Sequence, residues 1–374
     1  MNSPDIAQYD HFIPVSTPRL LEALQQTALS PSQKTIMQKL NQLISFQFYQ
    51  QLVTLKNDYL AYNPDRELLL DQPEQADPAG CINSLKSILT AANFSELNQQ
   101  QIEFALQKTS PYGLEIQIDF SAFEDVSLFY RGKRNSSIEI RDWKSLYLKK
   151  KSVGMIHYQR LFLLLRYKDQ QYKPGIHLKL FKDIPSPDLE MLFPECKVRM
   201  KVIDKVKLAV TGGGGTAGGL LATIGKVTAA VSPWSIAVAV AGFGMLVWRQ
   251  ISKIFIQRTR YMATLAQNLY FHNLDNNAGA IIFLVDLARQ EEIKEVILAY
   301  AILNLQSISS VEQLDSACEQ WFLETFNTRI DFDVSDAVRK LRLFNILTED
   351  TAALNCRDSN QVIENLNTQW QAFI

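Results

Sequence analysis

The chain has 374 residues, of which 47% are apolar and 21% are charged, and its formal net charge is −1. This length allows two or three domains, and the balanced charge excludes a global attraction to nucleic acid or to an anionic surface. The four cysteines lie far apart without paired spacing, which excludes a disulfide framework and a cysteine-based zinc site.

The N-terminal part has the signals of helices. Thr17-Pro18 and Ser30-Pro31 each place a capping residue before a proline suited to the first helical turn. After the second pair, apolar residues recur at steps of three and four as far as Leu55, which predicts one long amphipathic helix. We expect two shorter helices at about 81–92 and 99–108.

From residue 114 the apolar period changes from that of a helix to that of a strand. The stretch LEIQIDF alternates apolar and polar residues, and VSLFYRG, RLFLLLRYK and GIHLKLFKD read as further strands between turn signals. We therefore predict a small, mostly antiparallel sheet that the N-terminal helices cover. Together they would form a soluble α+β domain over residues 1–204.

The charge distribution has a gap in which no acidic residue occurs, between Asp204 and Asp275. Inside it, a helix from Leu208 to about Thr228 has roughly 21 residues and spans about 31 Å, close to the roughly 30 Å of a hydrocarbon core. A second uncharged run ends at Trp248, and basic residues flank both outer ends. These features predict a two-helix transmembrane hairpin with an amphipathic stalk over 205–262. The alternative is a buried hairpin in a soluble protein.

The glycine-rich stretch VTGGGGTAGG, residues 210–219, matches G-x-G-x-x-G. A dinucleotide site also requires an acidic residue about 20 positions later, and the chain has none there. A flexible linker is excluded because the stretch runs directly into the apolar LLATI. Small residues spaced four apart let membrane helices approach closely. We assign this packing role to Gly214, Gly218, Ala222, Ala237 and Ala241.

The C-terminal part, residues 263–374, is rich in helices. Ser310 and Gln313 form a capping-box pattern; a short IDFDV strand, a helix capped by Ser335, a turn-containing pair and a last helix follow. This order is similar to that of a winged helix. The basic residues of the would-be recognition helix lie among several aspartates, which argues against nucleic-acid binding.

Four stretches occur in order over nearly the whole chain: HFIPV; ANFSELNQQQIEFAL with DFSAFEDVSLFYRGKR; HLKLFKDIPSPDLEMLFP; and NLYFHNLDNNAGAIIFLVDLARQEEIKEVILAY. Together they resemble the family called domain of unknown function 3754, whose animal member is the mitochondrial transmembrane protein 143. The resemblance implies membrane association through a helix pair at residues 205–262. It implies no activity.

No catalytic signature is present. The histidines are scattered without the spacing of metal ligands, and no G-x-S-x-G or H-E-x-x-H motif occurs. We predict no catalytic residue, no metal and no cofactor, and whether the protein is an enzyme stays open.

A hairpin returns the chain to the side on which it started, so the segments before and after it should approach each other. The candidate ligand or domain-junction site predicted there consists of Lys179, Lys182, Asp188, Glu190, Asn276 and Asn277. Lysines at such a junction can contact phosphates. In the alternative interpretation, Asp188 caps a short helix, the lysines form a solvated face, and the two asparagines cap the next helix.

The predicted fold is therefore α+β: N-terminal helices with an antiparallel sheet, a transmembrane hairpin, and a C-terminal winged-helix-like domain. The positive-inside bias places both termini on the cytoplasmic-type face of a plasma or thylakoid-type membrane. The predicted function is a non-catalytic integral membrane protein acting in assembly or interaction. Its predicted partners are membrane lipids and an unidentified protein, without nucleic acid, and self-association is left open. The alternative is a lipid- or phosphate-handling membrane enzyme or lipid-binding protein with a site near Lys179–Glu190.

Overall fold

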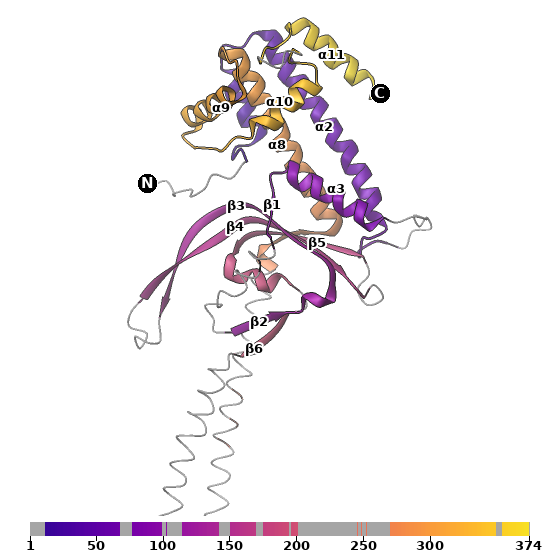
Figure 1. Cartoon of the computed structure of the whole chain (residues 1–374), viewed down its shortest axis with the longest axis vertical. Helices are drawn as coiled ribbons and strands as arrows, with labels where there is room; N and C mark the ends of the chain where they lie inside the picture. The colour runs from indigo at the N-terminus through magenta and orange to yellow at the C-terminus, as the bar shows by residue number, and fades with distance from the viewer. Residues whose placement is uncertain are drawn as a thin grey trace, which may run out of the picture.

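The computed structural model describes residues 12–67, 77–98, 102, 114–141, 150–169, 175–193, 196–200, 245, 248, 252, 270–348 and 354–373. These residues form a helical layer on one face of a curved antiparallel sheet, with a smaller two-stranded sheet beyond the opposite face (Figure 1).

The first helices are α1 (Thr17–Gln25), α2 (Pro31–Leu60) and α3 (Pro78–Ala91). The long helix predicted after Ser30 is confirmed as α2, and its capping box is complete because the Ser30 and Gln33 side chains each bond the other's backbone N–H. The helix predicted at 81–92 is confirmed as α3, which begins a few residues earlier. Apart from residue 102, the helix predicted at 99–108 lies outside the described residues.

The five-stranded sheet has the order β1-β3-β4-β5-β7, and each neighbouring pair is antiparallel. Its strands are β1 (Ser95–Glu96), β3 (Phe123–Arg141), β4 (Lys150–Tyr167), β5 (Ile176–Pro185) and β7 (Asn273–Asn276). The predicted antiparallel sheet is thus confirmed. The stretch LEIQIDF forms β2 (Leu114–Ile118), which pairs instead with β6 (Cys196–Met200) in the two-stranded sheet. Short 3-10 helices, η1 (Phe120–Ala122) and η3 (Ser186–Leu192), precede β3 and follow β5.

The C-terminal helices are α8 (Asn277–Leu305), α9 (Val311–Phe326), α10 (Val334–Leu343) and α11 (Ser359–Gln371). The predicted IDFDV strand is wrong, because the backbone N–H of Phe332 donates to the Glu319 side chain instead of to a strand partner. The predicted cap of the next helix, Ser335, lies two residues too late. Asp333 caps α10 and accepts a hydrogen bond from the Ser335 backbone.

Two cores occupy the two faces of the five-stranded sheet. Helix α8 is central to the larger core, which draws side chains from α1, α2 and α3 and from α9, α10 and α11. In β4, Phe162 and Leu164 face this core, whereas Leu161, Leu163 and Leu165 face the smaller core with η3. A strand buried on both faces reads as a continuous apolar run, which explains RLFLLLRYK. The domain boundaries at 204 and 263 stay a prediction.

The end of α2 is attached to the start of β5. The Tyr59 hydroxyl donates to the Ile176 carbonyl at 2.6 Å, and the Ile176 N–H donates to the Tyr62 carbonyl at 2.9 Å. Gly175 has φ +89°, and a Cβ at this position would lie 2.2 Å from that same Tyr62 carbonyl oxygen. The glycine therefore permits the close approach that seats α2 over the sheet.

No helix among the described residues is long and apolar enough to cross a membrane. The longest of them, α2 and α8, carry glutamine-rich or charged middle sections instead of an apolar span. This finding corrects the predicted fold class with its transmembrane hairpin. It also corrects the predicted integral-membrane function and the localisation with both termini on a cytoplasmic-type face. Apart from residues 245, 248 and 252, the segment 205–262 lies outside the described residues. So do its proposed packing residues, Gly214, Gly218, Ala222, Ala237 and Ala241.

Candidate functional site

The middle of α8 carries four ionisable side chains that are almost fully buried: Glu291, Glu292, Lys294 and Glu295, each at most 9% exposed. Burying a charge is costly unless it is paired and hydrogen-bonded. Clusters of buried charges are therefore candidates for functional sites as well as for structural networks, and their partners show what this cluster does.

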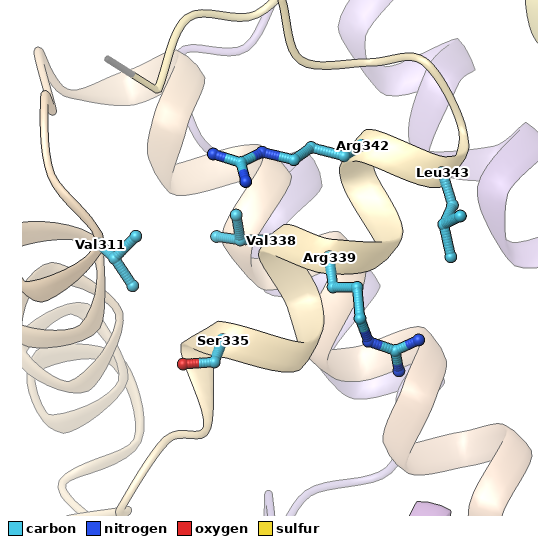
Figure 2. Close-up of a pocket in the computed structure, with 6 residues that line it drawn as sticks. All are labelled: Val311, Ser335, Val338, Arg339, Arg342 and Leu343. Atoms are coloured by element: carbon cyan, nitrogen blue, oxygen red, sulfur yellow. The ribbon is translucent and has the colours of Figure 1, made fainter. Parts of the chain in front are cut away.

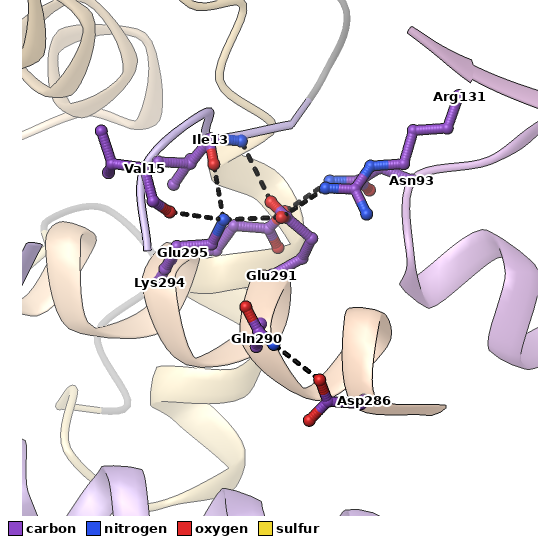
Figure 3. Close-up of polar contacts among 9 residues, drawn as sticks. All are labelled: Ile13, Val15, Asn93, Arg131, Asp286, Gln290, Glu291, Lys294 and Glu295. Carbon is purple, nitrogen blue, oxygen red and sulfur yellow. Dashed lines mark hydrogen bonds and ion pairs between the residues drawn. The ribbon is translucent and has the colours of Figure 1, made fainter. Parts of the chain in front are cut away.

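Glu291 lies between two cations. Its Oε1 accepts from Lys294 Nζ at 2.6 Å, one helical turn along α8, and from Arg131 Nη2 at 2.6 Å, which reaches over from β3 (Figure 3). Arg131 is itself only 9% exposed. One carboxylate thus serves two positive charges, and the triad carries a surplus of one positive charge.

The same residues hold the segment Phe12–Ser16, which we call the N-terminal strap. The Ile13 N–H donates to Glu291 Oε2 at 3.0 Å, while Lys294 Nζ donates to the carbonyls of Ile13 and Val15 at 2.5 and 3.2 Å (Figure 3). The Phe12 ring lies 4.5 Å from the Arg131 guanidinium carbon, a cation–π contact. Side chains of α8 and β3, rather than another strand, therefore bind the strap.

The neighbouring carboxyl group of Glu295 does not cancel the surplus charge. Burial raises the pKa of Glu295 to about 8, although the hydrogen bond from Asn93 Nδ2 at 2.8 Å opposes this shift. Glu295 is therefore mostly protonated at neutral pH. Glu292 is occupied elsewhere, in an ion pair with Lys340 of α10.

A pocket of about 390 Å³ lies between the strap, α8, the sheet and the loop after α9. Of the described residues, three cations line it, Arg131, Lys294 and Arg329, against one carboxylate, Glu291. The remaining lining residues are Phe12, Ile13, Pro14, Val15, Ser16, Gln159, Leu287, Gln290, Thr328 and Ile330. This volume falls within the range of about 300–1,000 Å³ that is typical of small-molecule sites.

The two arginines of this pocket have unused hydrogen-bond donors. A guanidinium group has five N–H donors, and within the described part of the chain Arg131 makes one hydrogen bond, to Glu291. The Arg329 side chain is exposed and has no hydrogen bond or ion pair with any described residue. Burial lowers the pKa of Arg131, and Glu291 opposes this shift. The arrangement therefore suits a carboxylate or phosphate group, which accepts paired hydrogen bonds from arginine.

Of the site residues that we predicted from the sequence, the structure brings only some together. Lys179 of β5 and Asn276 of β7 are direct partners in the antiparallel ladder. Lys182 is exposed, and its carbonyl lies 2.8 Å from the Nδ1 of His272. Asp188 lies in η3, where burial raises its pKa to about 6. The backbone of Glu190 belongs to the same 3-10 helix.

Asn277 has a structural position at the start of α8. Its Oδ1 accepts from the Leu178 N–H at 3.0 Å and from the Tyr59 hydroxyl at 3.3 Å, and its Nδ2 donates to Asp65. These bonds join α2, β5 and α8 at one point. A ligand-binding role for the six predicted residues stays a prediction.

The sequence reasoning missed Arg131, Glu291, Lys294 and Arg329 as site residues. A usable signal was present, because the charged stretch EEIKE, residues 291–295, interrupts an otherwise apolar helical run. The stretch HFIPV, which overlaps the strap, contributed only to the family resemblance. Among the described residues, no group of three or more His, Cys, Asp or Glu side chains is arranged to hold a metal ion.

The model of the family described as "Protein of unknown function (DUF3754)" matches residues 123–279, which confirms the resemblance that the sequence motifs indicated. The matched segment includes Arg131 and Gln159 and ends before the cluster on α8. No solved structure matches the chain.

Proposed function

We propose that this DUF3754 protein binds a small anionic ligand, carrying a carboxylate or phosphate group, in the pocket beneath the N-terminal strap. The observation that carries the proposal is the buried guanidinium group of Arg131. It lines the pocket and uses one of its five donors within the described part of the chain.

The charge of the pocket supports an anion. Arg131 and Lys294 together carry +2, Glu291 carries −1, and Arg329 adds +1, which leaves a net charge of +2 around the pocket. At 4 Å and an effective dielectric constant of about 20, two unit charges interact by about 4 kcal/mol. A bound anion would supply the negative charge that the described residues do not place there.

Each residue of the pocket has a distinct part in this proposal. Arg131 forms the charged base, and its position is held by Glu291 and by the Phe12 ring. Arg329 approaches from the exposed side as the second charged contact, and Gln159 offers an amide group. Apolar lining by Leu287 and Ile330 suits the short carbon skeleton of an organic anion.

Calorimetric titration tests the proposal with inorganic phosphate and succinate as probes. We expect at least one probe to bind the unchanged protein. Arg329→Gln should weaken that binding about 10-fold or more, because a hydrogen bond to a charged group is worth about 1.5–3 kcal/mol. Arg66→Gln, an exposed arginine beyond the end of α2, is the matched control and should bind normally. The proposal would be overturned if neither probe bound the unchanged protein, or if both variants lost binding equally.

A further inference from the structure

A second hollow lies in the C-terminal helices, between the start of α9 and the exposed side of α10. It has a volume of about 470 Å³ and is lined by Val311, Ser335, Val338, Arg339, Arg342 and Leu343, which we call the α10 groove. In Figure 2, Val311 and Val338 face each other, and the Arg342 side chain extends beside them. The groove therefore combines an apolar floor with cations at its edge.

The opposite side of α10 is held firmly in place. Ala337 and Leu341 are buried in the larger core, and Lys340 forms ion pairs with Glu292 of α8 and with Asp336. The groove is thus a surface of a rigidly packed helix, and a ligand can bind to it without first ordering the helix.

Two side chains at the groove have no partner of matching chemistry among the described residues. Leu343 is 65% exposed, although it is a large apolar residue. The Arg342 side chain is also exposed and has no hydrogen bond or ion pair within the residues that the structure describes. Arg339, in contrast, pairs with Asp336. In the part of the chain that the structure describes, the positive charge of Arg342 therefore lies unpaired beside the exposed apolar side chain of Leu343.

We propose that the α10 groove binds a short acidic segment of a partner protein. One or two apolar side chains of that segment pack against Leu343 and Val311, above Val338, which is only 4% exposed at the bottom of the groove. A neighbouring carboxylate pairs with Arg342. Charge complementarity and the apolar floor together define this partner, since helical or extended peptides commonly bind through apolar anchors flanked by charges. The proposal is independent of the anion pocket under the strap.

A protein segment fits this groove better than a nucleic acid does. Nucleic-acid binding depends on neutralising many phosphates with an extended basic surface. Here Asp331, Asp333 and Asp336 lie just before or within the first turn of α10, where they would repel a phosphate backbone. A single carboxylate on a peptide can reach Arg342 without approaching them.

Selection from a phage-displayed library of random dodecapeptides tests the proposal on the full chain. We expect enriched peptides to combine Asp or Glu with Leu, Ile or Phe. Fluorescence anisotropy with the enriched peptides should show binding at least 10-fold weaker for both Arg342→Glu and Leu343→Gln. The matched controls are Arg66→Glu and Ile282→Gln, at exposed positions away from the groove, and both should bind as the unchanged protein does.

Three outcomes would overturn the proposal: enriched peptides that lack acidic residues, peptides that bind Arg342→Glu and Leu343→Gln as tightly as the unchanged protein, or a 20-base-pair DNA duplex that binds at the groove instead.

Circular dichroism of each variant shows whether it is folded. Leu343→Gln replaces an exposed side chain and keeps the charge, so it tests the apolar contact separately from the ion pair. Succinate and phosphate binding under the strap should be unchanged in both groove variants, which separates failure here from failure of the proposed function.

Discussion

At the scale of single residues, the charges of α8 show how burial changes the chemistry of a side chain. Glu291 and Glu295 lie one turn apart on the same helix and are buried to a similar extent. Glu291 has two cations at 2.6 Å, whereas Glu295 accepts a hydrogen bond from the neutral amide of Asn93. An ionised carboxylate is stable beside cations, and a carboxyl group without one is more stable protonated.

The raised pKa of Glu295 predicts a specific dependence of stability on pH. The folded pKa of about 8 lies above the unfolded value near 4.3, so the folded state binds more protons between these two values. The contribution of Glu295 to the free energy of unfolding is therefore fully present below the unfolded pKa. It is lost as the pH rises toward 8, by at most about 1.4 kcal/mol per pH unit. Glu295→Gln keeps an acceptor for Asn93 and should remove this part of the decline.

Urea unfolding of the unchanged protein and of Glu295→Gln at pH 5.5, 6.5 and 7.5 measures the difference directly. The free energy of unfolding of the variant should fall less steeply with pH than that of the unchanged protein. Parallel pH profiles would show that Glu295 is ionised in the folded state. Asp286→Asn, at an exposed carboxylate on the same helix, controls for the general loss of an acidic residue.

At the scale of elements, the N-terminal strap is an irregular segment that bends at Phe12 and Val15 and pairs with no described strand. Its position depends on two hydrogen bonds from Lys294, one bond to Glu291 and burial of the Ile13 side chain. Buried backbone carbonyls need donors, and here a lysine side chain supplies them. The strap is also one wall of the pocket, so its attachment shapes the proposed anion site.

Lys294→Met should loosen the strap without removing α8 from the core. The Ile13 and Val15 carbonyls lose the hydrogen bonds from Lys294, although the Ile13 carbonyl keeps the one from the Val15 N–H. Glu291 keeps its contact with Arg131. We expect amide hydrogen exchange of Ile13 and Val15 to accelerate about 10-fold or more, since exchange reports local opening. Exchange in the middle of α2 should change little.

The control for this experiment is Lys56→Met, an exposed lysine of α2 that should leave strap exchange unchanged. If exchange in the strap of Lys294→Met equals that of the unchanged protein, burial of Ile13 and the other strap contacts hold the segment, and the ion cluster has a different role.

At the scale of the whole molecule, the larger core joins helices from both ends of the described chain. Leu40 of α2, Ile297 of α8 and Phe322 of α9 belong to the same cluster of buried side chains. Aromatic contacts link α2 and α11 as well, with ring centroids of Phe46 and Trp370 at 5.5 Å. The two ends should therefore unfold together, because neither has a separate core among the described residues.

Phe322→Ala tests this cooperativity. Phe322 is fully buried, and removal of such a side chain costs about 3–5 kcal/mol. We expect the slowest exchanging amides of α2 and of α9 to lose protection by the same amount. Loss of protection in α9 alone would show that the C-terminal helices unfold as an independent unit. Leu343→Ala, at an exposed position on α10, should have a small effect on both.

Much of the local structure was predictable because its signals lie within a few neighbouring residues. The capping box of Ser30, the periodicity of α2 and the alternation of LEIQIDF depend on contacts within one element. The IDFDV stretch shows the limit of such reasoning. It has the composition of a strand, but a strand also needs a partner, and the Glu319 side chain takes the Phe332 donor instead. The candidate site was less predictable, because its charges come from three distant segments.

The sequence by itself determined where α2, α3 and the long strands form, and which family the segment 123–279 resembles, since periodicity, caps and motifs are local properties. Only the tertiary structure decided that β2 leaves the main sheet, that α8 is central to the core, and that Ile13, Arg131 and Glu291 meet in one cluster. The acid-free gap, the length of its uncharged runs and their basic flanks led to the transmembrane prediction, which no described helix supports. The physical reason is that residues far away in the chain decide whether a segment is buried, which strand it pairs with, and what surrounds its apolar side chains. Arg131 and Glu291, for example, are separated by 160 positions, and no local pattern encodes their contact.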